Sequence, residues 1–268
     1  MDNVEKLISD YSDEINKHRT WLKPFGKQRA KKWEGFLRSN PEGAICEALT
    51  RNLLSDRAVE VEPYEDLSSG GPDFRCIKGS KYFYVEVTCI SKESATKETG
   101  LPDTLPKPSR AQRYKLLTRQ IFYELCNKAS QCSALGSPCV VVICTLHFQA
   151  GCLCLGKKAA ENLLTGTPKI TLNIDVSRGE AVGSPYQSTE LQDSAYIRTD
   201  KTSVTLIEEA RRTISGVLLG PFGSLPIKVV GMLHPNPNHP FDRTLLPEIE
   251  FCRLAEGYQT GRLAVEWI

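Results

Sequence analysis

The sequence predicts an α/β fold in which a mixed sheet is flanked by helices. Three segments carry this prediction: residues 40–53 have the pattern of an amphipathic helix, residues 58–88 alternate as short strands, and residues 138–148 form a continuous β-branched run. A run of the last kind is typical of a strand that is buried on both faces. A further helical pattern precedes it, so the order is helix, three strands, helix, strand.

The first strong helix is predicted to begin after Asn40. Asn40 is a favourable N-cap, Pro41 suits the first helical position, and Glu42 is an acid in the first turn. Apolar residues then follow at helical spacing, namely Ile45, Ala48, Leu49 and Leu53. An earlier amphipathic pattern over residues 3–21 predicts another helix, and the basic stretch KPFGKQRAKKW lies between the two.

The strands after this helix carry two acids in unusual positions. A hairpin is predicted to turn at residues 78–80, with Asp73 at the start of one strand and Glu86 inside the apolar stretch of the other. Burying a carboxylate costs several kcal/mol unless a charged group meets it. Because residues on adjacent strands can face each other, the pair could hold a hard cation such as Mg²⁺. The alternative is that Asp73 caps a turn and Glu86 faces solvent.

A long helix is predicted over residues 109–131, after a polar loop that contains prolines. Its apolar stripe consists of Tyr114, Leu117, Ile121 and Leu125. Lys128 lies about 20° from Leu117 and Ile121 on the helical wheel, so this lysine ends the face that should pack on the sheet. Gln131 is its neighbour three residues on. The alternative for Lys128 is a side chain that reaches solvent near the helix end.

The second half of the chain has weaker signals. Residues 169–176 and 226–233 suit strands, residues 203–219 suit a helix or a strand, and the proline-rich residues 234–243 predict a turn. No stretch has the composition of a linker. We therefore expect one domain over residues 1–268, with a helical and basic segment at 1–39, a core at 40–146 and a C-terminal α/β extension of unassigned role at 147–268.

Composition narrows the classes of protein to which the chain could belong. The net charge is +2, with 40% hydrophobic and 25% charged residues, so any nucleic-acid surface must be a local patch. No apolar stretch reaches the roughly 18 residues that a membrane span needs, and the N-terminal residues lack the layout of a signal peptide. We therefore expect a soluble, cytoplasmic protein that does not contact a membrane.

The ten cysteines indicate reduced thiols rather than disulfides. Most of them lie in apolar segments; examples are Cys89, Cys139, Cys144, Cys152 and Cys154. Reduced cysteine behaves there as a small hydrophobic residue. Cys152 and Cys154 have no partner cysteine or histidine at zinc-site spacing, so no structural zinc is predicted.

In their order along the chain, these features resemble the PD-(D/E)XK nuclease superfamily. The matching features are a helix with Glu47, then Gly71-Pro72-Asp73, then Glu86-Val87-Thr88, then a helix and a buried strand. The resemblance covers roughly residues 40–146. It implies a restriction endonuclease-like α-β-β-β-α-β core and Mg²⁺-dependent (or Mn²⁺-dependent) hydrolysis of phosphodiester bonds.

The family's metal ligands can be carried over residue by residue. Asp73 and Glu86 match the acids that bind Mg²⁺, and the backbone carbonyl of Val87 completes this set. Glu47 matches the acid that the preceding helix often contributes, with Glu42 as the fallback. The resemblance thus implies a hard metal ion held by oxygen ligands from one helix and two strands.

The family's catalytic lysine is displaced in this chain. Thr88 occupies its usual position, two residues after the motif Glu, and threonine cannot supply a positive charge. Some family members carry the lysine on the following helix instead. Lys128 suits that arrangement, and with Gln131 it matches a Lys-x-x-Gln pair found in the family. The resemblance implies that Lys128 assists the attacking water and that Gln131 helps to place the nucleophile or the phosphate.

A nucleic-acid substrate requires cations for its phosphates. The candidates are Lys27, Arg29, Lys31 and Lys32 before the core, and Arg110 and Arg113 before the predicted long helix. The alternative is that these charges are solvated surface groups.

Three hypotheses remain open. The first is a Mg²⁺-dependent nuclease, with DNA expected over RNA and with a homodimer favoured if both strands are cut. The second is a catalytically inactive domain of the same fold that binds nucleic acid or a protein partner. Thr88 at the position of the motif lysine supports this hypothesis. The third is an unrelated α/β protein. The arrangement of Asp73, Glu86 and Lys128 in space distinguishes them.

Overall fold

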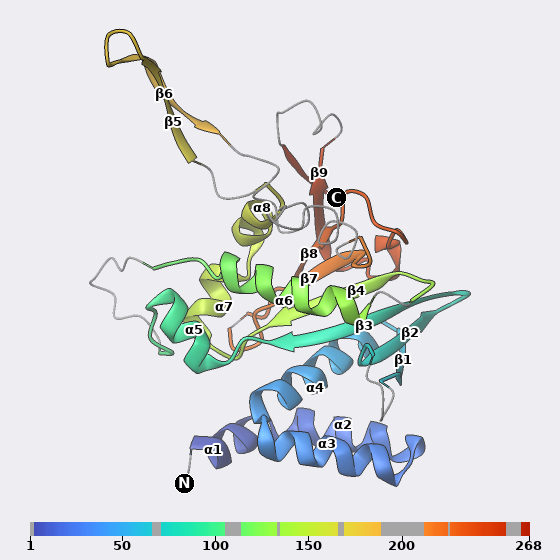
Figure 1. Cartoon of the computed structure of the whole chain (residues 1–268). Coiled ribbons are helices and arrows are strands. Elements are labelled where there is room, and N and C mark those ends of the chain that lie inside the picture. The colour runs from blue at the N-terminus through green and yellow to red at the C-terminus, as the bar shows by residue number, and fades with distance from the viewer. Residues whose placement is uncertain are drawn as a thin grey trace.

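The fold is an eight-stranded mixed sheet between two layers of helices (Figure 1). The computed structural model describes residues 3–65, 71–104, 114–132, 135–165, 169–188, 212–224, 226–255 and 264–268. In sheet order the strands are β1 (Glu60–Pro63), β2 (Phe74–Lys78), β3 (Lys81–Cys89), β4 (Cys139–Cys144), β7 (Gly216–Gly220), β8 (Val230–Leu233), β9 (Glu250–Leu254) and β10 (Val265–Trp267). This confirms the predicted α/β class with a mixed sheet and flanking helices.

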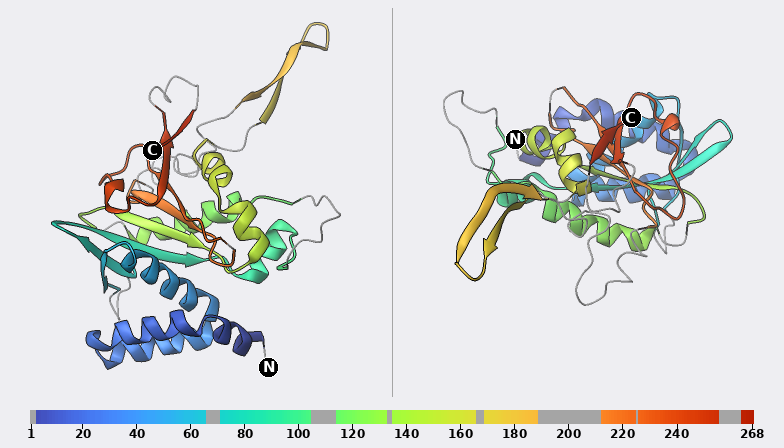
Figure 2. Two further views of the ribbon diagram at one scale, coloured as in Figure 1. Left: turned by 180° about the vertical axis from the view of Figure 1, so that it is seen from behind. Right: turned by 90° about the horizontal axis from the view of Figure 1, so that it is seen from above.

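Different helices cover the two faces of the sheet (Figures 1 and 2). One face carries α1 (Asn3–Asp10), α2 (Ser12–Leu22), α3 (Lys27–Ser39) and α4 (Pro41–Ser55), with the short 3-10 helix η1 (Lys23–Phe25) between α2 and α3. The other carries α5 (Lys92–Thr99), α6 (Thr118–Gln131), α7 (Phe148–Cys154) and α8 (Lys157–Thr165). Each layer buries its own apolar cluster against the sheet.

Strand β4 forms the centre of both apolar clusters. All six of its residues are buried, as the β-branched run predicts. Val140 and Val142 belong to the cluster beneath α4, whereas Val141 and Ile143 belong to the cluster beneath α6. The alternation of side chains along a strand explains this division.

The C-terminal residues extend the sheet rather than forming a unit of their own. Strands β1, β2 and β3 pair antiparallel, and β4 joins β3 in parallel. Strand β7 then pairs in parallel with β4, and β8, β9 and β10 follow along the same edge. The 3-10 helix η3 (Arg243–Leu245) lies between β8 and β9. A separate hairpin of β5 (Lys169–Asp175) and β6 (Glu180–Ser188) projects from the body (Figure 2).

Helix α4 begins where its sequence predicts. The Asn40 side chain accepts a hydrogen bond from the backbone N of Gly43 at 3.0 Å, and Pro41 is the first helical residue. The cap satisfies one of the backbone N–H groups that a helix start leaves without a partner. It therefore fixes the beginning of the helix that carries Glu47.

Two predictions between β3 and β4 are wrong. The predicted polar loop contains α5, which the Ser91 side chain caps at one end and Gly100, with φ of 75°, at the other. The long helix begins at Thr118 instead of residue 109, and Tyr114 is 41% exposed. Before it, the Lys115 backbone N bonds to the carbonyl of Thr99, a contact that competes with helical bonding. Residues 105–113 lie outside the described part of the chain.

The remaining segments agree with their patterns where they can be compared. Residues 3–21 form α1 and α2, and the basic stretch after them, for which no element was predicted, contributes η1 and most of α3. Residues 203–211 lie outside the described part, but a strand, β7, ends the segment that suited a helix or a strand. Residues 234–242 are irregular, as a turn requires. Within the described residues, no helix is long and apolar enough to cross a membrane.

Candidate functional site

The register of the hairpin places Asp73 beside Glu86. Phe74 pairs with Val85, so Asp73, the residue before, lies level with Glu86 on the next strand. The Asp73 carboxylate accepts a hydrogen bond from the backbone N of Val87 at 2.7 Å. Gly71, two residues before Asp73, has a φ of 124°. This backbone conformation favours glycine and lets the chain turn into β2.

The backbone carbonyl of Val87 faces the same side as Asp73. Tyr84 and Ile90 direct their N–H groups towards β4, so the odd-numbered residues between them direct their backbone groups towards β2. The first residue of β2, Phe74, pairs with Val85, so β2 has no backbone partner for Val87. The Asp73 side chain takes that place and accepts the Val87 N–H. The Val87 carbonyl therefore lies beyond the ladder that joins β2 to β3, next to a carboxylate.

Lys128 contacts Glu86 from helix α6. Its Nζ lies 2.5 Å from Oε1 of Glu86, whose side chain is only 4% exposed. The buried residues Leu117, Ile121 and Leu125 hold this face of α6 on the sheet, as the helical wheel predicts. The second oxygen of Glu86, Oε2, is buried and has no partner in full hydrogen-bond geometry within the described part of the protein, although the backbone N–H of Asp73 lies close enough to the carboxylate to lower its pKa.

Glu47 approaches the same acids from helix α4. Burial raises the pKa of Glu47 to about 8, and the carboxylates of Glu65 and Glu86 contribute to the rise. The Trp33 indole and Lys128 oppose it. Nε1 of Trp33 is buried near Glu47 but outside full hydrogen-bond geometry. The helix acid therefore lies within electrostatic reach of Glu86.

The acids outnumber the ammonium group that meets them. Burial raises the pKa of Asp73 well above its ordinary value, and the carboxyl groups of Glu86 and Glu47 add to this. Burial also raises the pKa of Glu86, although Lys128 acts against it. Burial lowers the pKa of Lys128, but the carboxylates of Glu86, Asp73 and Glu124 together outweigh this and raise it. The cluster therefore favours the arrival of further positive charge.

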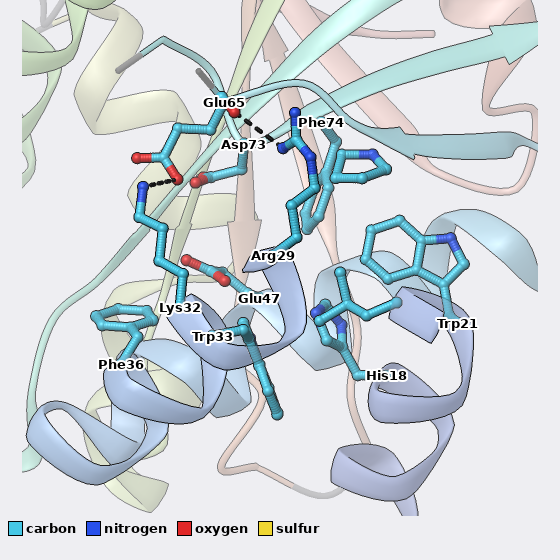
Figure 3. A pocket seen from close by; sticks show the side chains of 12 residues that line it. His18, Trp21, Arg29, Lys32, Trp33, Phe36, Glu47, Glu65, Asp73 and Phe74 are labelled. Carbon is cyan, nitrogen blue, oxygen red and sulfur yellow. Dashed lines mark hydrogen bonds and ion pairs between the residues drawn. The ribbon is translucent and has the colours of Figure 1, made fainter. Parts of the chain in front are cut away.

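A cavity of about 220 Å³ opens beside Asp73 and Glu47 on the side of α2 and α3. Figure 3 shows the carboxylates of Glu47, Glu65 and Asp73 turned towards this hollow. Arg29 donates to the backbone carbonyl of Glu65 at 2.9 Å, and Lys32 Nζ lies 2.8 Å from its carboxylate. Aromatic side chains form the other walls, namely Trp21, Trp33, Phe36 and Phe74.

Two of the predicted site residues, Glu42 and Gln131, lie elsewhere. Glu42, the fallback for the helix acid, accepts a hydrogen bond from the backbone N of Lys92 at 2.8 Å and so caps α5. Lys92 pairs with Asp103 at 3.0 Å. Gln131 is exposed at the end of α6, and no contact found within the described residues joins it to the acids.

The predicted basic residues fall into two groups. Lys27, Lys31 and Lys32 are exposed on α3, and Arg29 is half-buried there. Arg29 and Lys32 line the cavity, and both are bonded to Glu65. Arg110 and Arg113 lie outside the described residues.

Sequence reasoning missed three participants. Glu65 lies in the loop after β1, where no pattern marks it. His18 is buried and stacks on Trp33 with ring centroids 4.5 Å apart, and burial lowers its pKa to about 3. Glu124 accepts a hydrogen bond from Thr88 at 3.2 Å, and its position four residues before Lys128 could have revealed it.

Comparison with known proteins does not extend this description. A scan against protein-family models finds no match, and searches of curated proteins and of solved structures find no significant match either. The geometry of the site is therefore the basis for the function proposed below.

Proposed function

We propose that the chain is a metal-dependent nuclease that hydrolyses phosphodiester bonds of nucleic acid, with DNA as the expected substrate. The observation that carries the proposal is the contact of Lys128 with Glu86, one register position from Asp73. Helix α4, strands β1 to β3, helix α6 and strand β4 follow in the order that the PD-(D/E)XK resemblance implies. The antiparallel pairing of β1 to β3 and the parallel addition of β4 support the same assignment.

The residues present fit a hydrated hard cation. Within the described residues, Oε2 of Glu86 is buried and has no partner in full hydrogen-bond geometry, and three carboxyl groups share one close ammonium group. No three acidic side chains within the described residues have oxygens within 4.8 Å of one another, so a site that needs three carboxylates in direct contact is not present among them. Mg²⁺ does not need such a site, because it commonly takes one or two carboxylates and fills its other positions with water and substrate phosphate. Asp73, Glu86 and the Val87 carbonyl would hold it, with Glu47 acting directly or through water.

Each residue has a distinct role in this proposal. Mg²⁺ or Mn²⁺, when bound, polarises a phosphodiester oxygen and lowers the pKa of a coordinated water. Lys128 orients the attacking water or stabilises the charge that develops on the phosphate. The Val87 N–H holds the Asp73 carboxylate in place, and the Thr88 hydroxyl donates its hydrogen bond to Glu124. The exposed cations of α3 contact the nucleic-acid backbone beside the cavity.

The inactive-domain alternative is supported by two observations. Thr88 replaces the motif lysine, and Lys128 is already engaged with a carboxylate that the metal would need. Such a domain would bind nucleic acid through α3 and leave it intact. Binding and cleavage must therefore be measured on the same protein.

The test is a cleavage and binding assay on single- and double-stranded DNA and RNA, with and without Mg²⁺ or Mn²⁺. We expect Asp73→Asn and Lys128→Met each to lower metal-dependent cleavage by about 10²–10⁴-fold while binding persists. Lys81→Met is the matched control, because Lys81 forms an ion pair of the same 2.5 Å length with Asp242 at an exposed site. Binding without cleavage by the unaltered protein supports the inactive domain, and full activity of Lys128→Met refutes the role of Lys128.

A further inference from the structure

Three cysteines converge on the face of β3 opposite Glu86. Cys46 lies on α4, Cys89 ends β3 and Cys144 ends β4. Their sulfur atoms all lie within 4.8 Å of one another, and those of Cys46 and Cys89 are 3.2 Å apart. All three are free thiols. This group of three potential ligands is the only one so close within the described residues.

The arrangement is set by the fold rather than by sequence proximity. Cys89 pairs with Cys144 in the parallel register of β3 and β4. The two side chains point to the same face, where the apolar cluster packs them against α4 and Cys46. Cys132 and Cys139 provide a contrast, because their sulfurs lie 2.8 Å apart but belong to no such group of three among the residues that the structure describes.

The distances and the donor type suit a metal ion. A zinc–thiolate bond is about 2.3 Å long, so two sulfurs bound tetrahedrally to one ion lie about 3.8 Å apart and never more than about 4.6 Å apart. Small side-chain rotations would bring these three to one ion. Sulfur ligands select soft ions and disfavour Mg²⁺. Cys46 and Cys144 are buried, whereas Cys89 is half-buried.

We propose that Cys46, Cys89 and Cys144 form a binding site for one thiophilic d¹⁰ metal ion, Zn²⁺ or Cu⁺. Binding forms three metal–sulfur bonds and releases up to three thiol protons to solvent, without any change of oxidation state. A water or a nearby oxygen completes the coordination of Zn²⁺, whereas Cu⁺ needs only the three sulfurs.

The bound ion would join the elements that carry the acids. Cys46 directly precedes Glu47 on α4, and Cys89 follows Glu86 by three residues on β3. An ion bound to both would fix α4 against β3 and thereby the position of Glu47 relative to Glu86. The inference of this metal site rests on the sulfur geometry alone and does not depend on the nuclease proposal.

The test measures metal content of the full-length protein, purified under reducing conditions without chelator. We expect about one Zn²⁺ or Cu⁺ per chain, and at least about tenfold less in Cys89→Ala and Cys144→Ala. Cys132→Ala is the matched control, since it removes a buried thiol from a pair and should keep the metal. Asp73→Asn should also keep it, which separates this site from the acids.

A titration of the metal-free protein keeps the proposal falsifiable if a variant fails to fold. Addition of Zn²⁺ or of Cu⁺ should raise its melting temperature, and the ion that gives the larger rise at equal free concentration is the preferred one. Co²⁺ should develop thiolate charge-transfer absorption that Zn²⁺ removes. The absence of bound metal together with no rise for either ion overturns the proposal. So does a disulfide between Cys46 and Cys89 under the same conditions, because it would remove two of the three ligands.

Discussion

Strand β3 presents a different set of ligand atoms on each of its two faces. Towards α6 it carries Glu86 and Thr88, which meet Lys128 and Glu124. Towards α4 it carries Cys89, whose sulfur lies close to those of two further thiols. One strand thus carries hard oxygen ligands on one face and soft sulfur ligands on the other.

The two groups differ in what they cost the folded protein. Burial raises the pKa of Cys46 and of Cys144 well above the ordinary value, so these two thiols remain neutral, whereas their hydrogen bonds hold the pKa of Cys89 well below its ordinary value. Burial also raises the pKa of Asp73 and of Glu86, but there Lys128 acts against burial and favours the charged forms. Clustered carboxyl groups with strongly shifted pKa values are more often found at functional sites than thiols packed in a core. The comparison therefore favours the acid face as the centre of chemistry.

The largest expected effect is on the pair of Lys128 and Glu86. Lys128→Met leaves a buried carboxylate without its partner, and we expect it to lower the free energy of unfolding by about 3–5 kcal/mol at neutral pH. The loss should shrink in acid, where Glu86 takes up a proton. The double variant Glu86→Gln/Lys128→Met should recover most of it. Urea unfolding of the metal-free proteins, at neutral and at acid pH, measures the loss in Lys128→Met, its decrease in acid and its recovery in the double variant.

The exposed pair of Lys81 and Asp242 is the control for this prediction. Its atoms are also 2.5 Å apart, but the Lys81 side chain is 61% exposed. We expect Lys81→Met to cost no more than about 1 kcal/mol. Equal losses in the two single variants would contradict the view that burial makes the acid face of β3 costly.

Local signals were sufficient to predict the elements that position the acids. Asn40 and Pro41 mark the start of α4 by the chemistry of a helix cap, and the hairpin register follows from alternation. The adjacency of Asp73 to Glu86 follows from that register. The direction of Lys128 follows from the helical wheel once Leu117 and Ile121 are assigned to the core.

Contacts between distant segments could not be predicted in the same way. Cys89 and Cys144 were correctly interpreted as thiols in apolar segments, but their approach to Cys46 depends on how α4 crosses β3 and β4. Cys152 was assigned to the same class, yet it is exposed on α7 because the core-facing side of that short helix carries Cys154 instead. Glu65 joins the site only through Arg29 and Lys32 on α3.

The second expected effect is a pH dependence of stability that comes from Glu47. The pKa of Glu47 rises from 4.5 to about 8 on folding, so between these values the folded protein binds more protons than the unfolded chain. The free energy of unfolding therefore falls as pH rises, by at most about 1.4 kcal/mol per pH unit for this group. Glu47→Gln should remove this contribution. Urea unfolding of the metal-free protein and of this variant across the interval measures it.

The difference between the two proteins, rather than either curve, gives the contribution of Glu47 together with its effect on the pKa of Asp73. His18 acts in the opposite direction, because its pKa falls from 6.5 to about 3 and stability rises with pH between those values. Both proteins retain His18, so its contribution cancels. Parallel curves for Glu47→Gln and the unaltered protein would show that Glu47 ionises as it does in water.

The smallest expected effect concerns α4, the helix that the two faces share. Asn40→Ala removes the cap bond to the backbone N of Gly43, and we expect a loss of about 1 kcal/mol in urea unfolding. Glu47 lies seven residues beyond the cap, about 10 Å along the helix, where packing rather than capping holds the backbone. Cleavage and thiol-bound metal should therefore both persist within about twofold. If only one of them declined, the two faces would respond to separate parts of α4, and the helix would not couple them.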